Sequence, residues 1–142
     1  VAFDDEGKVC RLERWQGPWR QTEARLADLI GETYAVVDST GVGDPVVETL
    51  QTRCPSVEGF NFTSRSKQQI MEGLAIAIQT GGISYPDGWL RTELEAFEYH
   101  YTRTGVRYEA PSGFHDDGVC ALALACHARS FVSSRAFTFK VI

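Results

Sequence analysis

Three aspartates carry the strongest chemical signal in this sequence. Asp38 ends the short apolar, β-rich run from Tyr34 to Val37, while Asp116 and Asp117 stand side by side where an apolar helical segment begins. Open α/β sheets gather ligands and catalytic groups at the carboxyl ends of their strands. Neighbouring anions repel each other unless a cation lies between them, and carboxylate oxygens suit Mg²⁺ or Mn²⁺. We therefore predict that these acids form a metal cluster able to support phosphodiester cleavage.

Each acid also has a simpler structural explanation. Asp38, Ser39 or Thr40 is placed to cap the helix that begins near Asp44, and acids are favoured in the first turn of any helix. A cap needs only one carboxylate, so this explanation leaves the adjacent pair unexplained. His115 fits a contact with the site, a cap or an exposed surface, whereas His100 and His127 are interpreted as ordinary helix residues.

Two cations near a predicted helix start, Arg65 and Lys67, are candidates for contact with a DNA backbone, although cations in polar segments are commonly just solvated. The chain has 14 Lys and Arg against 19 Asp and Glu, a formal net charge of -5. This balance excludes binding of nucleic acid by phosphate neutralisation alone, so any DNA contact must be local. The Gly-rich segment STGVGDP lacks both the P-loop ending and the GxGxxG spacing of nucleotide sites.

Length and composition favour one domain with a substantial core, since the chain has 142 residues and is 43% hydrophobic. No apolar run approaches the roughly 20 residues of a membrane helix, and acids stand where a secretory signal would be basic. We therefore predict a cytosolic protein. The four cysteines form no CxxC pair, so we expect reduced core thiols rather than zinc ligands or disulfides.

Apolar periodicity and turn residues predict alternating strands and helices behind an N-terminal hairpin. The predicted elements are a hairpin (VAFD, DEGK, VCRLERW), helices at 19–30, from near 44, 64–79, 90–101 and 115–129, strands at 34–37, 57–63 and 106–110, and a short strand GISYP. The tail SFVSSRAFTFKVI is expected to add a strand or to be disordered at its serines. This order predicts an α/β fold with a parallel sheet core, an antiparallel edge and flanking helices.

Four segments in this order and spacing resemble the C-terminal nuclease domain of the large terminase subunit of tailed bacteriophages. They are VVDSTGVGDPVVETL, FTSRSKQQIMEGLAIAIQTGGISYP, LRTELEAFEY and GFHDDGVCALALA. The resemblance implies a ribonuclease-H-like fold with a mixed sheet and a front antiparallel hairpin. We expect residues 1–130 to form this domain and 131–142 to be a C-terminal tail.

The resemblance also implies a function. It implies an endonuclease dependent on Mg²⁺ or Mn²⁺, with two ions, that cuts concatemeric double-stranded viral DNA during packaging in the cytoplasm of the infected host. Asp38, Asp116 and Asp117 match the family's metal-binding and catalytic acids. The implied partners are DNA, the ATPase domain of the same subunit, the portal and the small terminase subunit, with no membrane.

This sequence departs from the family's pattern at one position, the first metal-binding acid. The family's first metal-binding acid lies on a strand upstream of the one that VAFDDEGKV resembles, so we expect the first strand to be missing from this chain. Asp4 and Asp5, at the predicted hairpin turn, are poor substitutes. Two other hypotheses are a structure-specific nuclease similar to Holliday-junction resolvases and a non-catalytic docking module of the packaging motor whose acids serve as caps.

Overall fold

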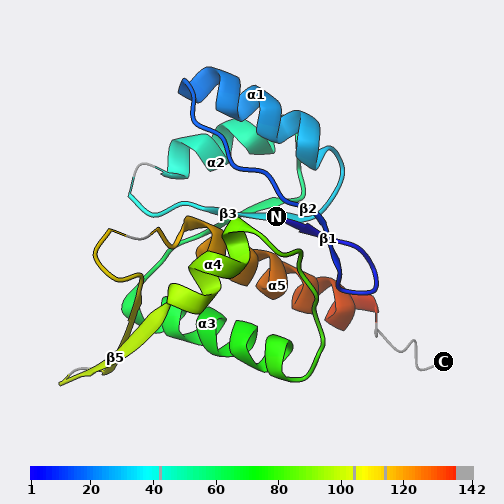
Figure 1. The fold of residues 1–142 in the computed structure, drawn as a ribbon. Coiled ribbons are helices and arrows are strands. Elements are labelled where there is room, and N and C mark those ends of the chain that lie inside the picture. The colour runs from blue at the N-terminus through cyan, green and yellow to red at the C-terminus, as the bar shows by residue number, and fades with distance from the viewer. Residues whose placement is uncertain (42, 104, 114, 137–142) are drawn as a thin grey trace. The chain divides into compact units, whose positions relative to one another are not determined.

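A computed structural model of the chain describes residues 1–41, 43–103, 105–113 and 115–136. It divides the chain into two units. The inserted unit is the continuous segment Glu13–Phe62, and the split unit combines Val1–Leu12 with Thr63–Ile142. Helices and strands are interspersed along the chain (Figure 1), which confirms the predicted mixed α/β class.

The inserted unit is a helix followed by a β-α-β arrangement. Its elements are α1 (Trp19–Ile30), β3 (Ala35–Asp38), α2 (Gly43–Gln51) and β4 (Val57–Phe60). β3 and β4 pair in parallel, with Asp38 opposite Phe60. A parallel pair needs a crossover between its strands, and α2 is that crossover. The helix predicted at 19–30 and the strand, turn and helix predicted after it are confirmed.

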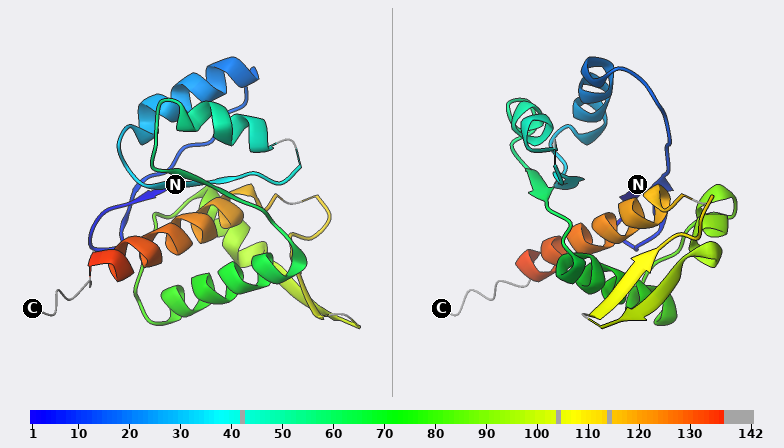
Figure 2. Two further views of the ribbon diagram at one scale, coloured as in Figure 1. Left: turned by 180° about the vertical axis from the view of Figure 1, so that it is seen from behind. Right: turned by 90° about the vertical axis from the view of Figure 1, so that its left-hand side faces the viewer.

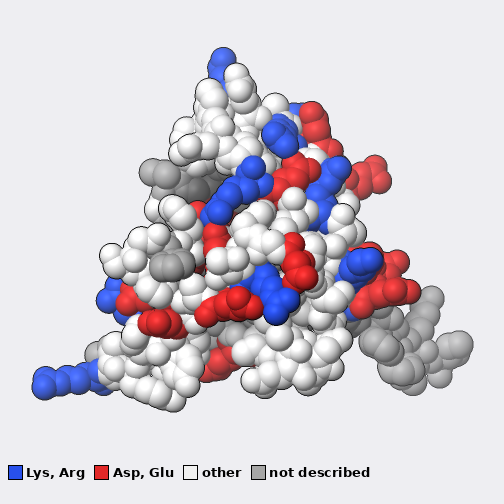
Figure 3. Space-filling view, viewed as in Figure 1, with Lys and Arg blue, Asp and Glu red and all other residues white. Residues whose placement is uncertain are grey.

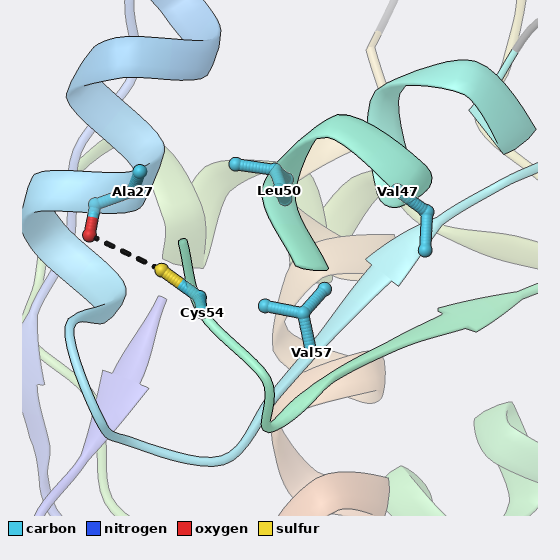
Figure 4. Close-up of a cluster of buried hydrophobic side chains, with 5 residues drawn as sticks. All are labelled: Ala27, Val47, Leu50, Cys54 and Val57. Carbon is cyan, nitrogen blue, oxygen red and sulfur yellow. Dashed lines mark hydrogen bonds between the residues drawn. The ribbon is translucent and has the colours of Figure 1, made fainter. Parts of the chain in front are cut away.

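A small apolar cluster holds the inserted unit together (Figure 4). It is formed by Ala27, Val47, Leu50, Cys54 and Val57. The side chains of Leu50, Cys54 and Val57 are 1% exposed. Cys54 follows α2 in the chain, and its thiol donates a hydrogen bond to the carbonyl oxygen of Ala27 in α1 at 3.5 Å. The cluster therefore packs both helices against β4, the partner of the strand that ends in Asp38.

The split unit contains the remaining elements. They are β1 (Ala2–Phe3), β2 (Val9–Arg11), α3 (Ser64–Gln79), α4 (Trp89–Ala96), β5 (Glu98–Thr102), β6 (Gly105–Glu109) and α5 (Asp117–Ala136). α3 and α5 run side by side, and α4 packs against α5 (Figures 1 and 2). Leu74, Leu90 and Leu122 contribute one buried side chain from each of these helices. α5 is nearly apolar all round because α3, α4 and β1 all contact it.

The N-terminal hairpin is confirmed, since β1 and β2 pair antiparallel. Asp4 Oδ1 accepts hydrogen bonds from the amides of Glu6 and Lys8, so this acid stabilises the hairpin turn. The strand predicted at GISYP is reduced to a single parallel bridge between Lys8 and Ser84. Arg129 of α5 also reaches the turn, where it donates to the carbonyl of Asp5 at 3.2 Å.

The helix predicted at 90–101 was wrong in its second half. α4 ends at Ala96, and Glu98–Thr102 is instead the strand β5, which pairs antiparallel with β6. Tyr99 lies directly opposite Tyr108 on β6, and aromatic cross-strand pairs stabilise hairpins. Of the apolar residues whose spacing suggested a continuous helix, Leu90 and Leu94 lie in α4, whereas Tyr101 pairs with Val106. The two strands form the hairpin seen in Figure 2. His100 consequently lies in a strand, not in a helix as interpreted from the sequence.

Two other element ends differ from the prediction. β4 stops at Phe60 because Thr63, expected to end this strand, instead caps α3. α5 continues to Ala136, so 131–136 are helical, and the rest of the predicted tail lies outside the described residues. The strands of the described chain are organised as three two-stranded sheets, one parallel and two antiparallel.

Charged side chains of both signs lie interspersed on the face shown in Figure 3. Among the described helices, none combines the length and the apolarity needed to cross a membrane. The four cysteines are free; Cys54 is buried, but Cys10 is exposed, so its predicted core position was wrong. Cys10 faces solvent because it lies on the short β2 strand, whose buried residue is Val9.

Candidate metal centre

Asp38 is the last residue of β3, and its side chain is exposed. Its Oδ1 accepts a hydrogen bond from the backbone amide of Thr40 at 2.8 Å, a side-chain turn typical of aspartate. The Thr40 hydroxyl in turn accepts from the amide of Phe62 at 2.9 Å. The carboxylate thus organises the turn that leaves the sheet. Thr40 precedes α2, so Asp38 Oδ1 does not cap that helix as the capping explanation expected.

The strand end that carries Asp38 is packed closely against β4. Ser39, the next residue, is buried, and its amide donates to the carbonyl of Phe60 at 2.9 Å. A Cβ atom on Gly59 would lie 3.1 Å from Ser39 Cβ and 3.1 Å from its Oγ. Glycine at this position therefore lets Ser39 sit against the neighbouring strand, which fixes the backbone beside the aspartate.

Asp116 and Asp117 lie where α5 begins. Asp117 is its first residue, and the carbonyl of Asp116 accepts from the amide of Cys120 at 2.9 Å, the first turn of the helix. The Asp116 side chain is partly buried and that of Asp117 is exposed. The exposed side chain of His115 precedes them. The predicted positions of the acid pair, at the N-terminus of a packed helix, are therefore confirmed.

The capping explanation for these acids is weakened by a residue from another helix. Glu93 of α4 is only 7% exposed, and its Oε2 accepts a hydrogen bond from the amide of Gly118 at 2.9 Å. A capping aspartate would accept a hydrogen bond from an amide of this first turn. Here Glu93 of α4 accepts the bond from the Gly118 amide in place of Asp116 or Asp117. A Cβ on Gly118 would lie 2.6 Å from the same oxygen and 2.5 Å from the Trp89 ring.

Sequence reasoning missed Glu93, although a signal was present. Leu90, Leu94 and Phe97 form an apolar stripe at helical spacing, and Glu93 lies on that same face. An acid within an apolar stripe must find a hydrogen-bond partner when it is buried. The first turn of α5 provides it.

Lys67 contacts Asp116, the first acid of the pair, directly. Its Nζ lies 3.0 Å from Asp116 Oδ2. The two side chains are 26% and 31% exposed, respectively. The ammonium is also 6.0 Å from the centroid of the Phe97 ring, which stacks on Tyr108. Burial, reinforced by the charge of Glu72, raises the pKa of Tyr108, so its phenol stays neutral. Arg65, the other predicted DNA contact, is exposed.

The first turn of α3 holds Lys67 in place through a capping box. The Thr63 hydroxyl accepts from the amide of Ser66 at 3.1 Å, and the Ser66 hydroxyl accepts from the amide of Thr63 at 2.8 Å. The amide of Lys67 donates to the carbonyl of Thr63 at 2.9 Å. Local hydrogen bonds therefore position the lysine backbone independently of its side-chain partner.

The three predicted ligands come from different parts of the chain. Asp38 belongs to the inserted unit, and Asp116 and Asp117 belong to the split unit. Within either unit, the described residues contain no group of three or more His, Cys, Asp and Glu side chains placed to hold a metal ion. The pairing of Asp116 with Lys67 nevertheless shows that a cation is held at the start of α5.

Residues 15–129 match the model of the terminase RNaseH-like domain. Two curated relatives are similar in sequence, both named as the large subunit of terminase, from Thermus phage G20c and Thermus virus P23-45. Each is 35% identical over 133 residues, and the match covers 85% of this chain. The chain spans only 26% of the length of each of these relatives.

Solved structures give the same result for the fold. The large terminase nuclease from thermophilic phage G20c with bound cobalt has a TM-score of 0.77 at 34% identity, covering 87% of this chain and 69% of that one. The same nuclease with bound magnesium has a TM-score of 0.69 at 32% identity, covering 78% and 62%. The large terminase nuclease domain of Thermus phage P74-26 has a TM-score of 0.72 at 30% identity, covering 85% and 66%.

Proposed function

Because this chain belongs to the terminase RNaseH-like domain family, we propose that it cleaves concatemeric double-stranded viral DNA during genome packaging as a metal-dependent endonuclease. The observation that carries the proposal is the surroundings of Asp116. Its carboxylate pairs with the Lys67 ammonium, while the amide of Gly118 in the first turn of α5 is bound by Glu93 from α4. An acid that holds a cation at a helix start suits a metal ligand better than a cap.

We propose Asp38, Asp116 and Asp117 as the metal ligands and catalytic residues. All three provide carboxylate oxygens, the donors that Mg²⁺ and Mn²⁺ prefer, and the ion pair of Asp116 with the Lys67 ammonium supports a positive charge at this position. Two related nuclease structures hold cobalt and magnesium, which supports a divalent ion. Two bound ions would supply an activated water and stabilise the leaving oxygen of the phosphodiester.

The protein side chains set the geometry around these ligands. The bond from the Thr40 amide fixes one oxygen of the Asp38 carboxylate, and α5 fixes the backbone of Asp116 and Asp117. Arg65 is exposed in the first turn of α3, where its planar guanidinium suits a phosphate oxygen, and we propose Arg65 and Lys67 as the local DNA contacts. Such local contact is consistent with the net charge of -5.

The remaining parts of the role belong to the whole subunit. The chain covers 26% of its curated relatives, so the ATPase domain, the portal and the small terminase subunit are proposed partners of a longer protein. We propose that this protein acts in the cytoplasm of the infected bacterial host, where phage DNA is packaged.

Anomalous diffraction from crystals soaked in Mn²⁺ tests the ligand assignment. We expect Mn²⁺ bound by Asp38 together with Asp116 or Asp117 at oxygen distances of about 2.0–2.3 Å. Asp116→Asn should remove the anomalous peak, whereas Asp87→Asn, at an exposed acid paired with Arg91, should leave it. If no Mn²⁺ is bound at these carboxylates, the ligand assignment is wrong and the non-catalytic docking module is favoured.

Cleavage assays test the reaction and the substrate. In the 142-residue chain, or in a longer chain that contains it, Asp38→Asn and Asp116→Asn should each lower Mn²⁺-dependent cleavage of linear duplex DNA on the order of 100-fold. Asp87→Asn is again the matched control. Faster cleavage of a four-way junction than of linear duplex would instead favour a resolvase-like nuclease.

A further inference from the structure

The ion pair between Lys67 and Asp116 is poorly explained as a device for stability. Lys67 lies in the first turn of α3, where the helix dipole disfavours a positive charge. Both side chains are partly exposed, so solvent screens their attraction. α3 already has a capping box, which stabilises its N-terminus without the lysine. The position therefore favours a role for the ammonium toward its partner over a role in folding.

The ammonium lies against one of the two carboxylate oxygens through which Asp116 would bind a metal ion. It lies 3.0 Å from Oδ2, and the Phe97 ring is 6.0 Å from the same nitrogen. Two cations close to one carboxylate oxygen repel each other strongly in a partly desolvated setting. A metal ion and the ammonium therefore compete for Asp116.

We propose that Lys67 is the resident counter-ion of Asp116 and that the ion must displace it, so that this lysine sets how tightly the site takes its metal. This inference rests on the proposed function for the role of Asp116 as a ligand. Lys67 acts here as a positioning residue: it keeps the carboxylate oriented and neutralised until the exchange takes place. A site of this kind binds its metal less tightly than the bare carboxylates would.

Calorimetric titration of the 142-residue chain with Mn²⁺ alone, without DNA, tests this exchange. Lys67→Met removes the charge while keeping an unbranched side chain, and it should lower the Mn²⁺ dissociation constant about tenfold. Lys67→Arg keeps a cation and should stay within about twofold of the parent. Lys8→Met removes one positive charge from the exposed hairpin turn and should also leave the affinity within about twofold, which controls for net charge.

A double variant separates this effect from general stability. In an Asp116→Asn background, Lys67→Met should no longer change Mn²⁺ affinity, because the competition requires the carboxylate. If the parent binds Mn²⁺ through Asp116 but Lys67→Met binds it equally or less tightly, the counter-ion role is wrong while the proposed function stands. If neither protein shows binding that depends on Asp116, the ligand assignment itself fails, and the inference fails with it.

Discussion

Glu93 Oε2 accepts a hydrogen bond from the amide of Gly118 at 2.9 Å, so a carboxylate of α4 binds the first turn of α5 directly beside the two candidate metal ligands. The acid is 7% exposed, and the glycine is buried as well. This bond satisfies an amide that has no partner within α5 and places a negative charge at the positive end of the helix dipole. It therefore links the packing of two helices to the position of Asp116 and Asp117.

Removing this carboxylate should destabilise the chain. Glu93→Ala leaves the buried amide of Gly118 without this acceptor, and we expect the free energy of unfolding to fall by about 1–3 kcal/mol. Glu93→Gln keeps an acceptor oxygen but loses the charge, so its loss should be smaller. Urea unfolding followed by circular dichroism measures both. Equal stability of the alanine variant and the parent would show that the bond does not support α5.

Gly118 should not tolerate even a methyl group. A Cβ there would meet the Trp89 ring at 2.5 Å and Glu93 Oε2 at 2.6 Å, so Gly118→Ala should lower the free energy of unfolding by about 1–3 kcal/mol through overpacking. Gly73→Ala is the matched control, since Gly73 is exposed inside α3 with nothing within 4 Å of its Cβ position. Helix propensity predicts that this control gains about 0.5–1 kcal/mol. A neutral Gly118→Ala would contradict the close α4–α5 packing.

The strand end at Asp38 should be sensitive to Gly59. Gly59→Ala would bring a Cβ to 3.1 Å from Ser39 Cβ and Oγ, so we expect a loss of about 1 kcal/mol in the free energy of unfolding. Gly17→Ala, in the same unit and with open space at its Cβ position, should change stability by less than about 0.5 kcal/mol. A Gly59→Ala variant as stable as Gly17→Ala would show that Ser39 is not tightly packed against β4.

The cysteines should differ in reactivity toward iodoacetamide. Burial raises the pKa of the Cys126 thiol, an effect that the charge of Arg129 partly offsets, so little reactive thiolate is present at neutral pH. Labelling of Cys126 should therefore accelerate about tenfold per pH unit until its pKa is reached, while the exposed Cys10 is labelled first. Mass spectrometry of the modified peptides gives both rates. In concentrated urea the difference should vanish; a fast Cys126 in the folded chain would contradict its burial.

Much of the fold could be predicted because local signals and tertiary packing agree. The helix at 19–30 ends at a glycine, as predicted. The helix at 64–79 was predicted from its apolar spacing with Ser64 or Ser66 as its cap, whereas the cap is Thr63. The error after Ala96 has a specific cause: aromatic residues at helical spacing also fit a hairpin, and the pairing of Tyr99 with Tyr108 favours the strand. Such cross-strand partners are not visible in the local pattern of one segment.

The candidate site was predictable only in part. Asp38, Asp116 and Asp117 are at the predicted strand end and helix start, since these positions follow from local patterns. The partners that give them their surroundings are distant in sequence. Lys67 was singled out as a DNA contact, but its pairing with Asp116 joins residues of α3 and the start of α5, and the bond between Glu93 and Gly118 joins α4 to α5. Neither could be predicted without the packing of the helices.

The split unit is assembled from two chain segments with the inserted unit between them, which affects the order of events during synthesis. A ribosome completes Phe62, the last residue of the inserted unit, before it makes any part of α3. The N-terminal hairpin, by contrast, must wait for Ser84 and later for Arg129, its partners from far downstream. Domains tend to fold as units as they emerge, and closing such long loops costs entropy. The part of the split unit that is translated first is thus among the last to gain its native neighbours.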